Sequence, residues 1–212
     1  MKNQSINNQL KGSQAMIRNA KSSSIIQQKL TEWGYSPQKI NEAEALLNNT
    51  QLAQQTKKQD YLAKRDVDRQ WRSDWAAFQQ QYAEHRAVAK AIFRKDPATL
   101  ERLRLSQALP KRINDILDQA EDFYQELGEG KEMAKLGVKA DELNQAKAMV
   151  STLVQLRERR LQCKGAAESS TQKRNQALAD LRTWQQEFSR VAKMALKDDP
   201  QLLEALGIMV PN

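Results

Sequence analysis

The chain has only one cysteine and one histidine among its 212 residues, and this scarcity limits the chemistry that it can carry. Cys163 cannot form a disulfide within the chain, and Cys163 with His85 cannot supply the cluster of nitrogen and sulfur ligands that a zinc site needs. The sequence contains no glycine-rich phosphate loop, nucleophile elbow or zinc-protease motif. We therefore expect no metal, no cofactor and no catalytic residue, and we expect that the protein is not an enzyme.

Glycine, proline and aromatic residues are also scarce. The chain holds seven glycines and five prolines, and aromatic residues make up 6% of it. With so few helix breakers, a sequence this rich in Gln, Ala, Lys, Glu and Leu is expected to be mostly helical. No apolar run approaches the length of a membrane span, and the first ten residues lack an apolar stretch suited to secretion. These features predict a cytoplasmic protein without a membrane span.

The net charge of +8 is unevenly distributed along the chain. Residues 57–72 carry six basic and three acidic side chains, and residues 157–174 carry six basic and two acidic ones. Residues 111–135 reverse the sign, with four basic against seven acidic side chains. A basic excess points to nucleic acid or an anionic surface as a partner. The interleaved acids favour internal ion pairing instead, so nucleic acid is the less favoured partner.

The chain repeats a pattern at an interval of 103 residues. Asp96-Pro97 and Asp199-Pro200 are each followed by Leu, Glu and Leu at the same three offsets. The same interval, without a gap, relates Gly34 to Gly137 and the Val-Ala-Lys run at 88–90 to the one at 191–193. A fixed period of this kind predicts a tandem duplication of one helical unit.

The positions of the breakers predict where the helices of each repeat lie. A helix is expected from about Ser13 to Trp33, ending at Gly34, followed by a long helix that starts at Pro37 and ends near residue 94. The second repeat offers a helix over 110–127 and a long helix from about residue 140 that ends before Asp199. The sequence leaves two alternatives near Gly165: a continuous helix, or a kink or break. Asp96 and Asp199 are expected to cap short helices.

This pattern predicts an all-α fold: an elongated antiparallel helical bundle, similar to a four-helix bundle, built from two tandem repeats of about 103 residues. The expected division is a flexible N-terminus over 1–12, repeat 1 over 13–105 and repeat 2 over 106–212, with the repeats packed as one domain. A period of this length, with one helix continuing between units, is also similar to the spectrin repeat. That resemblance implies a three-helix arrangement, although the Asp-Pro insertion after residue 94 departs from it.

Apolar residues follow the four-three spacing of a coiled-coil seam in both long helices. On that seam His85 is expected to be a buried histidine with satisfied hydrogen bonds, because its counterpart one repeat later is Phe188. Cys163 lacks the partners of a catalytic thiol. A role of the aromatic seam in stacking nucleic-acid bases is less favoured than a role in the core.

The sequence thus favours a non-catalytic interaction or scaffold protein that presents helical faces to a protein partner or to a second copy of itself. Nucleic-acid or anionic-surface binding through the basic helix midsections is the alternative. Aromatic side chains would act as hydrophobic anchors where they are exposed, and basic side chains would steer an acidic partner. The candidate partner-binding residues are Trp71, Trp75, Phe78, Tyr82, Trp184, Phe188, Arg65, Arg69, Arg160 and Lys164.

Overall fold

The structure is a computed structural model that describes residues 5–128 and 130–209, and within these ranges every regular element is a helix. None of the described helices combines the length and the apolar composition that a membrane crossing requires. The elements are α1 (Ile6–Ser22), α2 (Ser24–Glu32), α3 (Pro37–Ile92), α4 (Pro97–Arg102), α5 (Ile113–Leu127), the 3₁₀ turn η1 (Met133–Leu136), α6 (Ala140–Ala195) and α7 (Pro200–Ala205).

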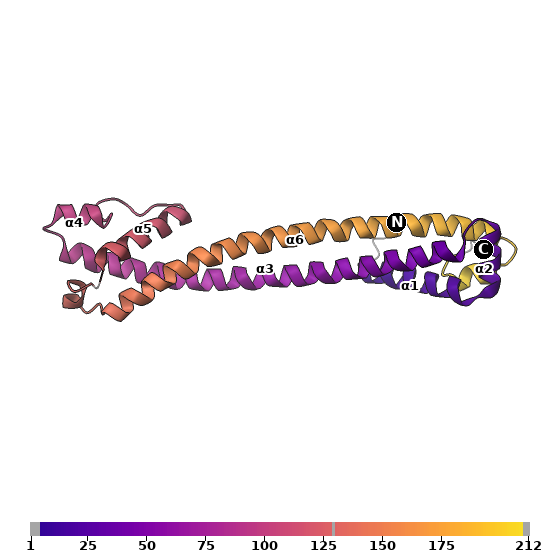
Figure 1. The fold of residues 1–212 in the computed structure, drawn as a ribbon, viewed down its shortest axis with the longest axis horizontal. Coiled ribbons are helices and arrows are strands. Elements are labelled where there is room, and N and C mark those ends of the chain that lie inside the picture. The colour runs from indigo at the N-terminus through magenta and orange to yellow at the C-terminus, as the bar shows by residue number, and fades with distance from the viewer. Residues whose placement is uncertain (1–4, 129, 210–212) are drawn as a thin grey trace. The chain divides into compact units, whose positions relative to one another are not determined.

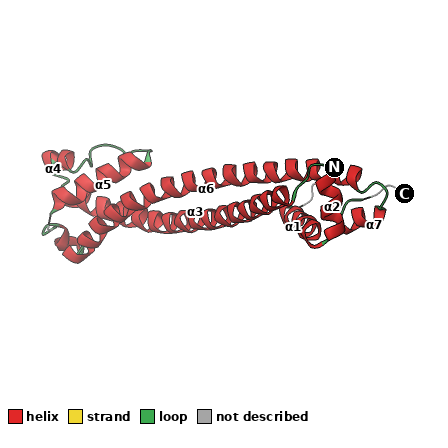
Figure 2. Ribbon diagram, turned by 45° about the vertical axis from the view of Figure 1, so that its right-hand side comes forward, coloured by secondary structure: helices red, strands yellow, loops and turns green. Residues whose placement is uncertain are grey.

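The helices form two compact units. Unit 1 combines Met1–Tyr61 with Ala166–Asn212, and unit 2 is Leu62–Gly165. In unit 1, α1 and α2 lie beside the first part of α3 and the last part of α6 (Figure 1). In unit 2, α4 and α5 lie beside the last part of α3, near the start of α6 (Figure 2). These units divide the chain differently from the expected repeats 13–105 and 106–212, which remain a prediction from the sequence.

The two long helices have equal lengths and matching positions in the 103-residue period. Helices α3 and α6 both contain 56 residues, and both of their ends are 103 residues apart. The short helices α4 and α7 follow at the same offset, each with a proline at its first position. Asp96 caps α4 as expected, because its carboxylate accepts the Thr99 backbone N–H at 3.0 Å. Asp199 precedes α7 without such a bond, and its carboxylate pairs with Lys29 instead.

Two sequence-based boundaries are wrong. The first helix begins at Ile6, so the expected flexible segment over 1–12 is too long; residues 1–4 lie outside the described part. The single helix expected up to Trp33 is divided at Ser23. The backbone of Ser23 is extended, and its side chain caps α2 by accepting the Ile26 backbone N–H. The sequence left open whether the long helix is broken near Gly165, and in the structure α6 is continuous through this glycine.

Each unit has its own apolar core. In unit 1, side chains of α1 and α2 pack with the first part of α3 and the last part of α6 around Phe188. In unit 2, side chains of α5 pack with the last part of α3 and the first part of α6 around Phe78 and Phe123. Residues 48–66 of α3 and 157–176 of α6 contain no buried apolar side chain. These midsections therefore add polar surface to the long helices. The fold is stabilised by the apolar side chains that are buried in the two cores.

Candidate interaction surface

The aromatic seam of α3 is a stacked ladder inside unit 2. Trp71 stacks on Trp75 with ring centroids 5.6 Å apart, and Phe78 stacks on Tyr82 at 5.4 Å. The ring of Tyr82 then meets Phe123 of α5 edge to face at 5.5 Å. Such pairs stabilise a core beyond the area that they bury.

Burial of this ladder limits its use as a binding surface. Trp71, Phe78 and Tyr82 are buried, and so are Trp184 and Phe188 in unit 1. Only Trp75 is half-buried among the six aromatic residues that the sequence singled out. Exposure was the condition for a role as hydrophobic anchors, and the five buried rings do not meet it. Their role is to form the core, as the seam spacing favoured.

Two basic side chains hold Asp68 beside the aromatic ladder. The Asp68 carboxylate accepts hydrogen bonds from Lys64 at 2.8 Å and from Arg160 of α6 at 2.9 Å. These two bonds hold the pKa of Asp68 below its usual value. The Arg160 guanidinium also lies 5.0 Å from the centre of the Trp71 ring. Arg160 therefore joins α3 to α6 through the Asp68 carboxylate, which it shares with Lys64.

The basic face of unit 2 is formed by Arg65, Arg69, Arg72 and Lys90 of α3. All four side chains are exposed. Positions 65, 69, 72, 76, 83, 87 and 90 follow one another at intervals of three, four or seven residues, so the four cations and the alanines at 76, 83 and 87 lie on one side of the helix. Among the described residues, the ion pairs of Arg65 and Arg69 within 4 Å are those with Asp66, at 3.9 and 3.7 Å. Exposed pairs at such distances contribute little, so this face keeps a positive potential. Lys164 is exposed on α6 and does not belong to this stripe.

A groove adjoins the basic face at its Lys90 end. It has a volume of about 450 Å³ and runs between α3 and the segment that leads into α5. Its apolar wall is formed by Leu109 and Ile116, and its floor includes Ala83 and Ala87. The face thus combines exposed cations with a depression that can accept an apolar side chain.

His85 is buried between three helices, and its hydrogen bonds are satisfied. Its Nδ1 lies 3.0 Å from the Tyr124 hydroxyl of α5, and its Nε2 lies 3.0 Å from the Glu142 carboxylate of α6. Burial raises the pKa of Tyr124 above its usual value, so this hydroxyl keeps its proton for a hydrogen bond. The buried, satisfied histidine expected from the sequence is confirmed. The described residues contain no group of three His, Cys, Asp or Glu side chains that could hold a metal ion.

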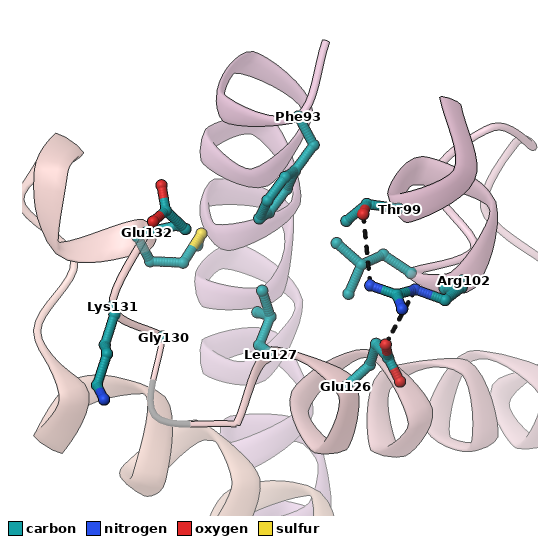
Figure 3. Close-up of a pocket in the computed structure, with 10 residues that line it drawn as sticks. Phe93, Thr99, Arg102, Glu126, Leu127, Gly130, Lys131 and Glu132 are labelled. Atoms are coloured by element: carbon teal, nitrogen blue, oxygen red, sulfur yellow. Dashed lines mark hydrogen bonds and ion pairs between the residues drawn. The ribbon is translucent and has the colours of Figure 1, made fainter. Parts of the chain in front are cut away.

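A second cavity, of about 380 Å³, lies in unit 2 between α4 and the segment that joins α5 to η1 (Figure 3). Phe93 and Leu127 form part of its apolar lining. Arg102 is the polar group on the α4 side, and it points to Glu126 at 3.1 Å and to the Thr99 hydroxyl at 3.4 Å. Because Arg102 is already paired within the chain, this cavity offers a weaker case for anion binding than the basic face.

The candidate residues chosen from the sequence omit two members of the basic face. Arg72 and Lys90 share the exposed side of Arg65 and Arg69, and the four-three spacing could have revealed this. The sequence instead drew attention to Arg160 and to the aromatic seam, which the structure places in structural contacts.

Comparison with other proteins assigns no family to this arrangement. No protein-family model, no curated protein and no solved structure matches the chain.

Proposed function

We propose that the chain is a non-catalytic helical interaction protein whose unit 2 docks an acidic segment of a partner protein on the basic face of α3. The observation that supports this proposal is the row of exposed cations at Arg65, Arg69, Arg72 and Lys90, in which Arg65 and Arg69 form only long, exposed ion pairs with Asp66. Such a row attracts an anionic partner over a distance of about 8–10 Å in physiological salt.

We further propose that the long helices arose by tandem duplication, supported by the 103-residue offset of α3 from α6 and of α4 from α7. One repeat later, Arg65, Arg69 and Arg72 correspond to Glu168, Gln172 and Asn175. The helix therefore tolerates non-basic residues at these positions. The arginines of unit 2 are not a requirement of the fold, which favours a role in binding.

A protein partner is favoured over nucleic acid because of what surrounds the basic face. Asp66 lies beside Arg65 and Arg69, and Asp115 and Asp118 are exposed on the neighbouring α5. These carboxylates repel a continuous phosphate backbone but are compatible with separate acidic side chains. The adjoining groove adds an apolar wall, which a partner helix with acidic and apolar residues can use. The cytoplasmic location expected from the sequence remains a prediction.

The test compares two fluorescent polyanions at about 0.15 M salt, the physiological range. Poly-L-glutamate of roughly 20 residues represents the acidic protein segment, and a duplex DNA of roughly 20 base pairs represents nucleic acid. The triple variant R65E/R69E/R72E is expected to weaken poly-L-glutamate binding by about tenfold or more, which corresponds to ~1.4 kcal/mol.

A matched control makes the same change of charge elsewhere. The variant K11E/R18E/R190E replaces three exposed cations of unit 1 and is expected to bind poly-L-glutamate nearly as wild type does. Equal losses in both triple variants would show a general charge effect and reject the site. Submicromolar binding of the duplex, lost in R65E/R69E/R72E, would instead establish nucleic-acid binding and overturn the proposal. Binding of neither polyanion, with dimerisation lost in that variant, would make a second copy of the chain the partner.

A further inference from the structure

Arg86 is a buried cation without a carboxylate partner in the described part of the chain. Its residue is 8% exposed, and the guanidinium is held only by Tyr82, through a hydrogen bond from Nη1 to the hydroxyl at 3.3 Å and a ring contact at 5.4 Å. Arginine has five N–H donors and keeps its charge at any physiological pH. A buried charge without a counterion is costly, so the position calls for a compensating anion.

The side chain of Arg86 borders the groove beside the basic face. Arg86 lines this groove with Lys90, which lies one helical turn further along α3. A carboxylate in the groove can thus accept hydrogen bonds from Arg86 and lie near the Lys90 ammonium group. Leu109 and Ile116 then face whatever apolar group is joined to that carboxylate.

The fold does not require an arginine at position 86. Its counterpart one repeat later is Ser189 of α6, which lies in an equally long helix. Lys90, in contrast, has Lys193 as its counterpart, near the end of α6 where a cation suits the helix dipole. The feature that distinguishes unit 2 is therefore the buried guanidinium.

We propose that the groove is the anchor site of the docking face and that it binds one carboxylate side chain of the partner protein, adjacent to an apolar side chain that packs on Leu109 and Ile116. This inference rests on the proposed function, because it names which group of the acidic partner is selected. The basic face attracts the partner, and Arg86 with Lys90 fixes the position of one of its Asp or Glu residues.

The test uses 4-methylpentanoate as the probe, since it joins a carboxylate to a leucine-like group. Binding is followed by the NMR signals of the Leu109 and Ile116 methyl groups. The neutral analogue 4-methylpentanamide should bind about tenfold more weakly or not at all. R86Q is expected to weaken binding of 4-methylpentanoate by about tenfold or more, and K90Q by a smaller factor. The control R190Q, which changes an exposed arginine of unit 1, should bind like wild type.

Several results would overturn the inference. These are unchanged binding in R86Q, equal binding of the amide, and signal changes confined to residues outside the groove. Tighter binding of 3-methylbutyl phosphate than of 4-methylpentanoate would show that the groove selects a phosphate group and not a side-chain carboxylate. If R86Q does not fold, K90Q and the carboxylate-to-amide ratio on the wild-type protein decide the question in the same way.

The anchor site and the docking face can be rejected independently of each other. Loss of poly-L-glutamate binding in R65E/R69E/R72E together with unchanged 4-methylpentanoate binding in R86Q retains the docking face and rejects the anchor. Selective binding of 4-methylpentanoate that depends on Arg86, together with no effect of the triple variant, retains a carboxylate site and rejects the docking face.

Discussion

The Thr50 hydroxyl of α3 lies 3.1 Å from the carbonyl oxygen of Ala177 on α6, in the interior of unit 1. In unit 2, His85 of α3 meets Glu142 of α6. The residue numbers of both pairs add up to 227, so α3 and α6 run antiparallel with the same register in each unit. In unit 1 this register is fixed by a polar contact, because Thr50 lies at the border of the apolar core.

Replacing Thr50 by valine is therefore expected to lower the free energy of unfolding by about 1 kcal/mol. Valine keeps the shape of threonine but removes a hydroxyl that bonds both to the Ala177 carbonyl of α6 at 3.1 Å and to the Leu46 carbonyl of its own helix at 2.8 Å. Urea unfolding measures this difference. The control is Thr152→Val, which removes an exposed hydroxyl that bonds only to Ala148 in its own helix, and its effect should be close to zero. Equal effects of both substitutions would show that the hydrogen bond between α3 and α6 makes no separate contribution to the free energy of unfolding.

The aromatic ladder of unit 2 leads to a graded prediction. Phe78→Ala should cost about 3–5 kcal/mol, because Phe78 is 1% exposed and no neighbour can fill its space fully. Trp75→Ala should cost less, since half-buried Trp75 already has part of its ring in water. The reverse order in urea unfolding, with a changed oligomeric state in Trp75→Ala, would show that Trp75 belongs to an interface.

Asp68 makes the stability of unit 2 depend on pH. Its carboxylate has a lowered pKa in the folded state because Lys64 and Arg160 donate hydrogen bonds to it. A lowered folded pKa contributes stability that is present above the unfolded value of about 3.9 and is lost as the pH falls through the folded pKa. Asp68→Asn should thus be less stable than wild type at pH 7, and the difference should shrink below about pH 4. A constant difference between pH 7 and pH 3, measured by urea unfolding, would contradict this role.

The sequence predicted the helical class and the limits of the long helices because few glycines and prolines interrupt the chain. The expected α3 end near residue 94 differs by two residues from Ile92. The division at Ser23 was missed although Ser23 is the middle one of three consecutive serines, and serine prefers the capping position to the helix interior. The residues proposed to bind a partner were harder to choose from the sequence, because a seam pattern gives the buried side of a helix without showing what covers it. Arg86 emerged only from the structure, since its burial depends on α5 and the segment before it.

The last prediction concerns Gly165, where the sequence left the continuity of the long helix open and the structure keeps α6 continuous. No atom lies within 4 Å of the place where a Cβ would be built on Gly165, so an alanine fits without strain. Gly165→Ala should raise the free energy of unfolding by about 0.4–1 kcal/mol, since alanine has less backbone freedom to lose on folding. Gly34→Ala is the contrasting variant: space around Gly34 is equally open, but its φ of +72° is strained for any side chain. It should therefore destabilise unit 1 by about 1–2 kcal/mol. If Gly165→Ala destabilised the protein as well, α6 would be bent or interrupted at Gly165 in solution, and the continuity of the polar midsection would be lost.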